Sequence, residues 1–231
     1  MVGLKPVILR VPIDLAAFAM NVLSVNVGTP TTITWGGRTF ETSIYKYPIN
    51  DRLSVTTLNL TGDAQADLTV HGGLDKAVYA YDAIHYTFWQ QQLPVRTDWS
   101  PGLFGENLTT TGLRDDEVRI GDVFRIGTVL LRSVQPRFPC FKLNARFDDR
   151  LMAKKFSDAV RCGIYFRVVE EGHIRVGDTI ELVEEAAEGV TIRDVAAWYF
   201  GKTTDPDALQ QLTELRYLPK RLKNQFKRMG G

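Results

Sequence analysis

The chain has 231 residues, of which 44% are hydrophobic and 24% charged, and its formal net charge is +1. This length and balance are typical of a globular protein with one substantial core, or with a main domain and a small appendage. A net charge near zero argues against a chain that coats nucleic acid or lies on a membrane surface. No stretch approaches the roughly 20 apolar residues that a membrane helix needs. We therefore expect a soluble, cytoplasmic protein.

Residues 1–19 are interpreted as an N-terminal extension. Lys5 and Arg10 precede a short apolar run that resembles a secretory signal, but Pro12 and Asp14 leave this run shorter than a normal signal core. A strand-like segment begins directly after Met20, which is therefore an alternative translation start.

Short β-rich segments dominate residues 20–185, which we expect to form one β-barrel domain. β-branched and aromatic residues between turn signals predict strands at 22–27, 38–45, 53–58, 117–126, 129–134, 164–169 and 179–183. Gly121-Asp122 and Gly177-Asp178 each precede alternating apolar residues, a pattern typical of tight turns in closed or nearly closed barrels. The expected fold class is mainly β with α (α+β).

Two helices are predicted among these strands. The first begins near Lys76, because four residues fall on one face at helical spacing: Ala77, Tyr81, Ile84 and Phe88. The second is predicted over 148–156.

Residues 190–231 are predicted to form a separate region of three short helices. Thr191-Ile192-Arg193-Asp194 is a variant of the capping box, Asp205-Pro206 supplies an N-cap and a first-turn proline, and Pro219 precedes the third helix. None reaches the ~12–15 residues at which an isolated helix becomes marginally stable, so they must bury apolar residues together. Six cations and no acid lie between Arg216 and Arg228.

One segment, Pro136-Arg137-Phe138-Pro139-Cys140-Phe141-Lys142-Leu143, places a cysteine among two prolines, two aromatic residues and two cations. The prolines fix φ and remove two backbone donors, which predicts a rigid, irregular loop. The cations favour a thiolate, the form that a metal ligand or a nucleophile requires. The alternative is a buried cysteine that packs as a small hydrophobic residue; the cations and the rigid frame favour the functional interpretation.

The other cysteine, Cys162, is interpreted as a small packing residue, with a reversible disulfide to Cys140 as the alternative. Two cysteines are too few for a disulfide framework, and we expect both to be reduced.

Three further segments are candidate site loops. In His71-Gly72-Gly73-Leu74-Asp75-Lys76 the glycines let backbone amides approach a ligand, and a following helix start suits an anion; a turn without a ligand is the alternative. The carboxylates of residues 62–67 are interpreted as caps and turn formers. Asn107, in the loop 104–108, either offers its amide to a heterocycle or caps its own turn.

Several common sites are not recognisable in this sequence. His71, His85 and His173 lack the close spacing of a multi-histidine metal site, and neither cysteine has a CxxC partner. There is no P-loop, no GxGxxG after a strand and no GxSxG elbow.

The motifs at 62–67, 71–81, 104–108, 120–122 and 136–143 occur in the order found in MOSC domains, named after the C-terminal domain of molybdenum cofactor sulfurase. Over about residues 22–230 the chain resembles the stand-alone bacterial YiiM-like branch of this family, which pairs a MOSC barrel with a small C-terminal three-helix region. The joint occurrence of the cysteine motif and the His-Gly-Gly motif carries the resemblance.

The resemblance implies a molybdopterin-type molybdenum cofactor, whose metal is held by two dithiolene sulfurs, oxygen ligands and a protein cysteine. On this chain that cysteine is Cys140, a soft donor suited to molybdenum. Four cations are candidates to neutralise the cofactor phosphate or orient its pterin: Lys46, Lys76, Arg137 and Lys142. Four other residues would line the cavity: His71, Gly72, Gly73 and Asn107.

The function implied is that of a molybdenum-dependent oxidoreductase, with Cys140 catalytic, that reduces and thereby detoxifies N-hydroxylated compounds such as hydroxylamino-purines. Its partners would be a small N-hydroxylated substrate and a separate electron-donating reductase, and it would act as a monomer or homodimer. The alternative is a non-catalytic carrier of the cofactor or of sulfur bound to Cys140. No pyridoxal-phosphate or Fe–S domain is recognisable, which favours the enzyme; pyridoxal phosphate binding enters only as a family-level association.

A third interpretation makes the basic C-terminal helix a nucleic-acid reader. The near-zero net charge favours a protein partner, or solvent alone, over nucleic acid at this helix.

Overall fold

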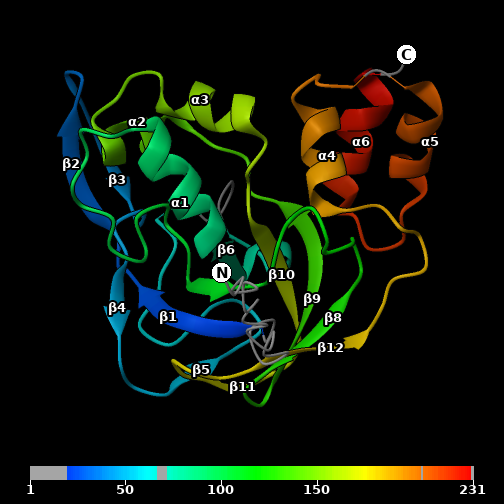
Figure 1. Cartoon of the computed structure of the whole chain (residues 1–231), viewed down its shortest axis with the longest axis horizontal. Helices are drawn as coiled ribbons and strands as arrows, with labels where there is room; N and C mark the ends of the chain where they lie inside the picture. The colour runs from blue at the N-terminus through cyan, green and yellow to red at the C-terminus, as the bar shows by residue number, and fades with distance from the viewer. Residues whose placement is uncertain (1–19, 67–71, 204, 230–231) are drawn as a thin grey trace, which may run out of the picture.

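The computed structural model of the chain describes residues 20–66, 72–203 and 205–229 and centres on an eight-stranded sheet (Figure 1). The strand order is β12-β8-β9-β10-β6-β7-β1-β4. Adjacent strands are antiparallel except β6 and β7, which are parallel. The strands are Asn21–Val27 (β1), Tyr47–Ile49 (β4), Val78–Asp82 (β6), Leu108–Thr111 (β7), Val123–Ile126 (β8), Val129–Pro136 (β9), Ile164–Glu170 (β10) and Ile180–Glu184 (β12).

The start of β1, the last strand but one in this order, lies beside the residue that precedes β12, the first strand. An antiparallel bridge joins Asn21 to Thr179, and the Val22 N–H donates to the Asp178 carbonyl over 2.9 Å. Among the described strands the hydrogen-bonded ladders do not go on to join β12 to β1, so closure into a barrel stays a prediction. The fold is a mixed α/β fold with a large, mainly antiparallel sheet.

Two small sheets accompany the large one. Thr31–Trp35 (β2) and Arg38–Thr42 (β3) form a hairpin, and Leu53–Val55 (β5) pairs with Gly172–Ile174 (β11). The hairpin is anchored at its tip, where Trp35 Nε1 donates to Asp148 Oδ1 over 2.8 Å. This contact joins the hairpin to the residue that ends α2.

The described segments contain six α-helices, in two groups in Figure 1. Ala83–Gln92 (α1), Phe141–Phe147 (α2) and Met152–Ala159 (α3) share one core cluster, and Ile192–Tyr199 (α4), Pro206–Glu214 (α5) and Lys220–Met229 (α6) form the second group. No helix among the described residues is long and apolar enough to cross a membrane.

The three predicted C-terminal helices are confirmed, together with their caps. Thr191 and Asp194 form the reciprocal capping box of α4, and the Asp205 side chain caps α5. The helices bury the expected apolar residues in the same core cluster as the strands, among them Val195, Leu212 and Phe226. The boundary between a domain over 20–185 and another over 190–231 stays a prediction.

The helix predicted to begin near Lys76 is wrong. Leu74–Lys76 is a single 3₁₀ turn, the strand β6 follows, and α1 begins only at Ala83. Every residue of β6 is buried. Its sequence therefore lacks the alternation of apolar and polar residues that marks a half-buried strand. Asp82 ends it and caps α1, accepting a hydrogen bond of 2.9 Å from the Ile84 N–H.

The predictions for residues 136–156 also need correction. The helix predicted over 148–156 corresponds to α3, which starts only at Met152, and the preceding helix α2, which Asp148 ends at φ +50°, was not predicted. The segment around Cys140 is irregular only over 137–140, since Pro136 closes β9 and Phe141 opens α2. A proline at the end of a strand terminates the ladder without leaving a gap in it.

The Gly-Asp turns are confirmed as local structures. Gly121 and Gly177 have φ of +106° and +87°, a region that L side chains rarely adopt. In each turn the aspartate accepts the N–H three residues back, at 2.8 Å for Asp122 and 2.9 Å for Asp178. The predicted strands at 38–45, 53–58 and 117–126 are shorter in the structure, ending at Thr42 and Val55 or starting at Val123.

A buried carboxylate, Asp115, ties the C-terminal helices to the sheet. Its Oδ2 accepts the N–H groups of Cys162 (2.9 Å) and Gly163 (3.2 Å), just before β10. Its Oδ1 accepts from Arg193 of α4 over 3.0 Å and lies 3.4 Å from Nε2 of His85 of α1. Burial alone would raise the pKa of Asp115, but His85, Arg193 and the Gly163 N–H outweigh it and lower the pKa from 3.8 to about 2.

Removal of this carboxylate should destabilise the fold. We expect Asp115→Ala to lower the free energy of unfolding by about 3–5 kcal/mol, because it leaves buried donors without their acceptor. In the wild type this contribution should be present above the ordinary pKa near 3.8 and fade as the pH falls toward 2.

Urea unfolding at pH 7 and at pH 3 measures both effects. The control is Asp116→Ala, which removes a partly exposed ion-pair partner of Arg114 and Arg193 and should cost about 1 kcal/mol or less. Equal losses in the two variants would contradict the central role of Asp115.

Candidate functional site

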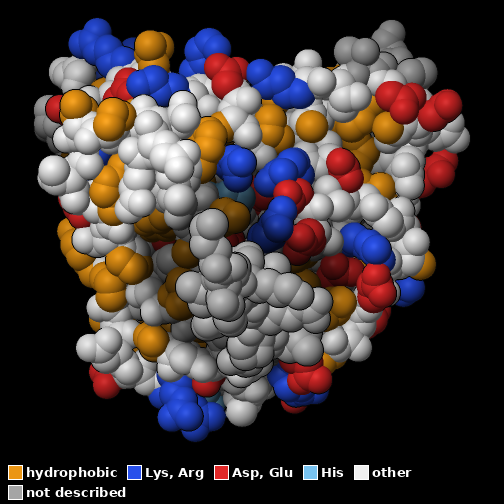
Figure 2. All heavy atoms as spheres, viewed as in Figure 1, with side chains coloured by type: hydrophobic (Ala, Val, Ile, Leu, Met, Phe, Trp, Pro, Cys, Tyr) orange, Lys and Arg blue, Asp and Glu red, His pale blue; other side chains and the backbone are white. Residues whose placement is uncertain are grey.

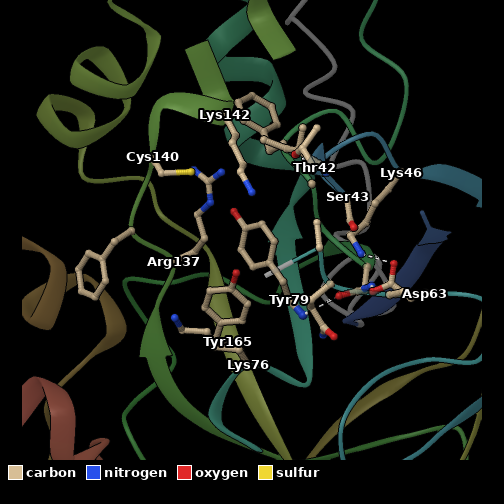
Figure 3. Close-up of a pocket in the computed structure, with 18 residues that line it drawn as sticks. Thr42, Ser43, Lys46, Asp63, Lys76, Tyr79, Arg137, Cys140, Lys142 and Tyr165 are labelled. Atoms are coloured by element: carbon tan, nitrogen blue, oxygen red, sulfur yellow. Dashed lines mark hydrogen bonds and ion pairs between the residues drawn. The ribbon is translucent and has the colours of Figure 1, made fainter. Parts of the chain in front are cut away.

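A cleft of about 690 Å³, counting its open mouth, lies where several chain segments meet (Figure 3). The segments are the connections β3–β4, β5–β6 and β9–α2, the turn before β7, and the strands β6 and β10. Eighteen of the described residues line it: Thr42, Ser43, Ile44, Lys46, Asp63, Ala64, Gln65, Ala66, Lys76, Tyr79, Phe104, Gly105, Asn107, Arg137, Phe138, Cys140, Lys142 and Tyr165.

Cys140 and Arg137 form one wall of the cleft. Cys140 is half-buried at the N-cap of α2, and Figure 3 shows its side chain directed toward the Arg137 guanidinium. Arg137 is only 6% exposed, and within the described part of the chain its Nη1 has no hydrogen-bond partner. A buried donor without an acceptor is costly, so this wall is suited to an anionic ligand.

The surroundings of Arg137 keep it charged. Burial disfavours the guanidinium cation, but Tyr79, Cys140 and Tyr165 outweigh burial and raise the pKa of Arg137. The guanidinium carbon lies 6.0 Å from the ring centroid of Tyr79 and 5.1 Å from that of Phe156. A permanent positive charge thus faces the cleft beside the one cysteine that lines it.

Lys46 and Asp63 form a buried ion pair elsewhere in the lining, with side chains 9% and 1% exposed. Asp63 Oδ1 also accepts the Gly28 N–H over 2.9 Å, and its Oδ2 accepts from Asn107 over 2.9 Å. Burial lowers the pKa of Lys46, and the attraction of Asp63 opposes this only in part. Asp63 therefore already neutralises the charge that Lys46 was predicted to offer to a phosphate.

The side chain of Asn107 is occupied by the protein itself. Its Oδ1 accepts the Tyr79 N–H over 3.1 Å, and its Nδ2 donates to Asp63 and, over 3.4 Å, to the Asn26 carbonyl. It lines the cleft, as predicted from the sequence, but what it does there is to hold Tyr79 and Asp63 in place.

Lys76 and Lys142 also line the cleft. Lys76 sits in the 3₁₀ turn before β6, and burial lowers its pKa, followed by the positive charge of Arg221 in α6. Asp75 and Cys140 act in the opposite direction. Lys142 lies in the first turn of α2 and points into the cleft in Figure 3.

The glycines predicted to line the cavity do not do so. Gly72 and Gly73 lie outside the lining, and a three-residue 3₁₀ turn follows them in place of the expected helix, so no helix N-terminus is available to an anion there. His71 lies outside the described residues.

Sequence reasoning missed Tyr79, Tyr165 and Ser43. The rings of Tyr79 and Tyr165 lie 5.1 Å apart within the cleft, and burial raises the pKa of Tyr165 to about 12. Ser43 Oγ is, after Arg137 Nη1, a second buried polar atom of the cleft lining that has no partner among the described residues. Tyr79 stands in the run misread as a helix; neither Ser43 nor Tyr165 belongs to a recognisable motif.

Sequence reasoning also overlooked Glu106, which shapes the turn before β7. This carboxylate is fully buried and accepts the N–H groups of Gly102 (2.8 Å) and Phe104 (3.1 Å), as well as the hydroxyl of Tyr86. Burial raises its pKa, although these hydrogen bonds act against the rise. The turn so fixed presents Phe104 and Gly105 to the cleft.

Cys162 behaves as a packing residue. It is fully buried in the aromatic core under α1–α3, both cysteines are free thiols, and burial raises the pKa of Cys162. A thiol in this environment is a poor ligand or nucleophile.

Within the described ranges, no three residues among histidine, cysteine, aspartate and glutamate are grouped so that they could hold a metal ion. Cys140 can therefore supply one soft ligand, and any metal bound there has to bring its other ligands with it.

Comparison with known sequences gives consistent matches. Residues 67–181 match the MOSC domain family. The uncharacterized protein YflK of Bacillus subtilis is 42% identical over 173 residues, 75% of this chain and 77% of YflK. Protein YiiM of Escherichia coli is 35% identical over 77% of this chain and 80% of YiiM. A Gibberella moniliformis protein named Reductase is 34% identical over 78% of this chain, which corresponds to 32% of that longer protein.

A solved structure extends the likeness beyond the matched domain. The crystal structure of YiiM from Geobacillus stearothermophilus superimposes with a TM-score of 0.76 at 29% identity, covering 92% of this chain and all of that one.

The buried pair of Lys46 and Asp63 supports the cleft, and its removal can be tested. We expect Asp63→Ala to lower the free energy of unfolding by about 3–5 kcal/mol, because it leaves the Lys46 ammonium buried without a counter-charge. In the double variant Lys46→Met/Asp63→Asn both charges are gone, and we expect most of the loss to be recovered. Urea unfolding compares the variants; a double variant as unstable as Asp63→Ala would show that the pair itself is not the source of the loss.

Proposed function

The chain belongs to the MOSC domain family, in its YiiM-like branch, and on this basis we propose that it is a molybdenum-cofactor-dependent oxidoreductase of N-hydroxylated compounds such as hydroxylamino-purines. The observation that carries the proposal is the buried, unpartnered Nη1 of Arg137 beside Cys140 in one cleft. The printed name of the Gibberella relative, Reductase, agrees with a reductive role but belongs to that protein.

The residues of the cleft fit such a cofactor. Arg137 Nη1 and Ser43 Oγ are buried polar atoms in need of a partner, which the phosphate or the polar pterin ring would supply. Cys140 is the one thiol in the lining, and it is a soft donor. When bound, the cofactor supplies two-electron redox chemistry at molybdenum, with Cys140 as the protein ligand.

The protein residues then have distinct tasks. Arg137, with Lys142 and Lys76, binds and orients the anionic group, because their charges face the same space. The rings of Tyr79 and Tyr165 exclude water from the wall between them. Lys46 and Asp63 keep their section of the lining neutral and rigid. The reaction proposed is R–NHOH + 2e⁻ + 2H⁺ → R–NH₂ + H₂O, with electrons from a separate donor.

Cys140→Ala should abolish turnover. Mutation of a residue that only supports a metal ligand typically lowers metal affinity or activity by about 10–100-fold. Loss of the ligand itself should cost at least as much, so we expect turnover to fall by about 100-fold or more. The assay uses protein from a cofactor-competent host, with reduced methyl viologen as donor and a hydroxylamino-purine as substrate.

The matched control is Cys162→Ala, which removes the packed thiol and should keep turnover while lowering thermal stability. Full activity in Cys140→Ala would contradict the ligand role. Wild-type protein that carries molybdenum and pterin yet shows no turnover would favour the carrier function.

Arg137→Met should separate cofactor binding from folding. A hydrogen bond to a charged group is worth roughly 1.5–3 kcal/mol, so the variant should bind the cofactor about 10–100-fold more weakly. The cofactor-free variant should be at least as stable as cofactor-free wild type, because Met replaces a buried charge that lacks a full set of partners. Molybdenum content, pterin fluorescence and thermal unfolding check this; undiminished cofactor content would contradict it.

A further inference from the structure

Helix α6 presents an outer face made of cations. Leu222 and Phe226 are buried against the rest of the three-helix group. The other face carries four exposed cations and the half-buried Lys223; the exposed ones are Lys220, Arg221, Lys227 and Arg228. The whole segment 215–229 contains no acidic residue.

The cations of α6 differ from other surface cations in being grouped on one helix without carboxylate partners. Elsewhere many cations pair with carboxylates, as in Lys154–Asp158 and Arg132–Glu184. Exposed cations without such a pair among the described residues, such as Arg38 and Arg52, lie singly on different segments. Figure 2 likewise shows basic and acidic side chains intermingled over the face it presents. For the cations of α6, by contrast, the part of the chain that the structure describes offers no carboxylate within 4.0 Å.

Local helix energetics do not account for this pattern. Lys227 and Arg228 lie in the last turn, where the helix dipole favours cations. Lys220 lies in the first turn, where the dipole disfavours them. The i,i+3 pair Lys220/Lys223 and the i,i+4 pair Lys223/Lys227 are like-charged neighbours, and each weakly destabilises the helix. A surface that keeps such repulsion without an internal counter-charge is best explained by an external one.

One residue of this basic face, Arg221, lies near the cleft, where its positive charge acts on Lys76 in the lining. Phe138, also in the lining, stacks on Tyr199 of α4 with ring centroids 3.7 Å apart. The three-helix group is thus attached to the cleft wall, with Arg221 near one of the residues that line it.

We propose that the outer face of α6 is the docking surface for an acidic electron-transfer protein that reduces the cofactor in the cleft. This inference rests on the function proposed above, which consumes two electrons for each N–O bond that it cleaves. Opposite charge accelerates the encounter of two proteins and orients them, and it does so without the tight binding that would block release after each electron. Weak redox complexes have small interfaces of this polar kind.

The test uses a plant-type [2Fe–2S] ferredoxin, kept reduced by its NADPH-dependent reductase, as the acidic donor. We expect ferredoxin-driven turnover by the wild type, with a KM for ferredoxin that rises at least tenfold between 50 and 300 mM NaCl. Lys220→Glu/Lys223→Glu should raise this KM about tenfold at low salt. Turnover with reduced methyl viologen should stay within twofold, since neither lysine lines the cleft.

The matched control is Arg38→Glu/Arg52→Glu, which makes the same change in net charge at two exposed positions away from α6. It should leave the KM for ferredoxin within twofold. Equal effects of the two double variants, salt-independent turnover, or no turnover with ferredoxin while viologen supports it would each overturn the docking proposal. Salt-sensitive binding of DNA to α6 with comparable strength would overturn it in favour of nucleic acid.

Absence of turnover with both donors in cofactor-loaded protein would refute the proposed function itself, and the docking surface would fall with it.

Discussion

A positive charge buried without a complete set of partners is the constraint on which this site depends. Arg137 lies beneath the surface between Tyr79 and Phe156, and one of its N–H-bearing nitrogens has no acceptor among the described residues. A protein interior tolerates such a group only at a cost of several kcal/mol, which a bound anion would offset. Because Arg137 and Cys140 line the same cleft, an anion bound to Arg137 would lie beside the soft sulfur of Cys140.

The other buried charges of the chain show what a purely structural arrangement looks like. Asp115 accepts from the Cys162 and Gly163 N–H groups and from Arg193, so its charge is compensated within the fold. Lys46 and Asp63 neutralise each other in the cleft lining. Arg137 differs from Asp115 and from the Lys46–Asp63 pair, because one of its nitrogens has no partner among the described residues. This difference separates a residue that binds a ligand from residues that only support the fold.

Much of the fold and the outline of the site could be predicted from the sequence, because local signals determined them. The Gly-Asp turns and the capping box of Thr191 work through contacts within three residues, and both are confirmed. The buried strand β6 could not be predicted, because a strand covered on both faces has no period-2 pattern. The pairing of Asp63 with Lys46, and the use of Asn107 to hold Tyr79, depend on tertiary contacts that spacing does not reveal.

X-ray absorption at the molybdenum edge tests the central claim most directly, because it counts the sulfur atoms bound to the metal. In cofactor-loaded wild type we expect three, two from the dithiolene and one from Cys140. In Cys140→Ala reconstituted to the same molybdenum content we expect two, while Cys162→Ala should keep three. A sulfur shell that is unchanged in Cys140→Ala would contradict the account, because the metal would then be held without the cysteine that Arg137 accompanies.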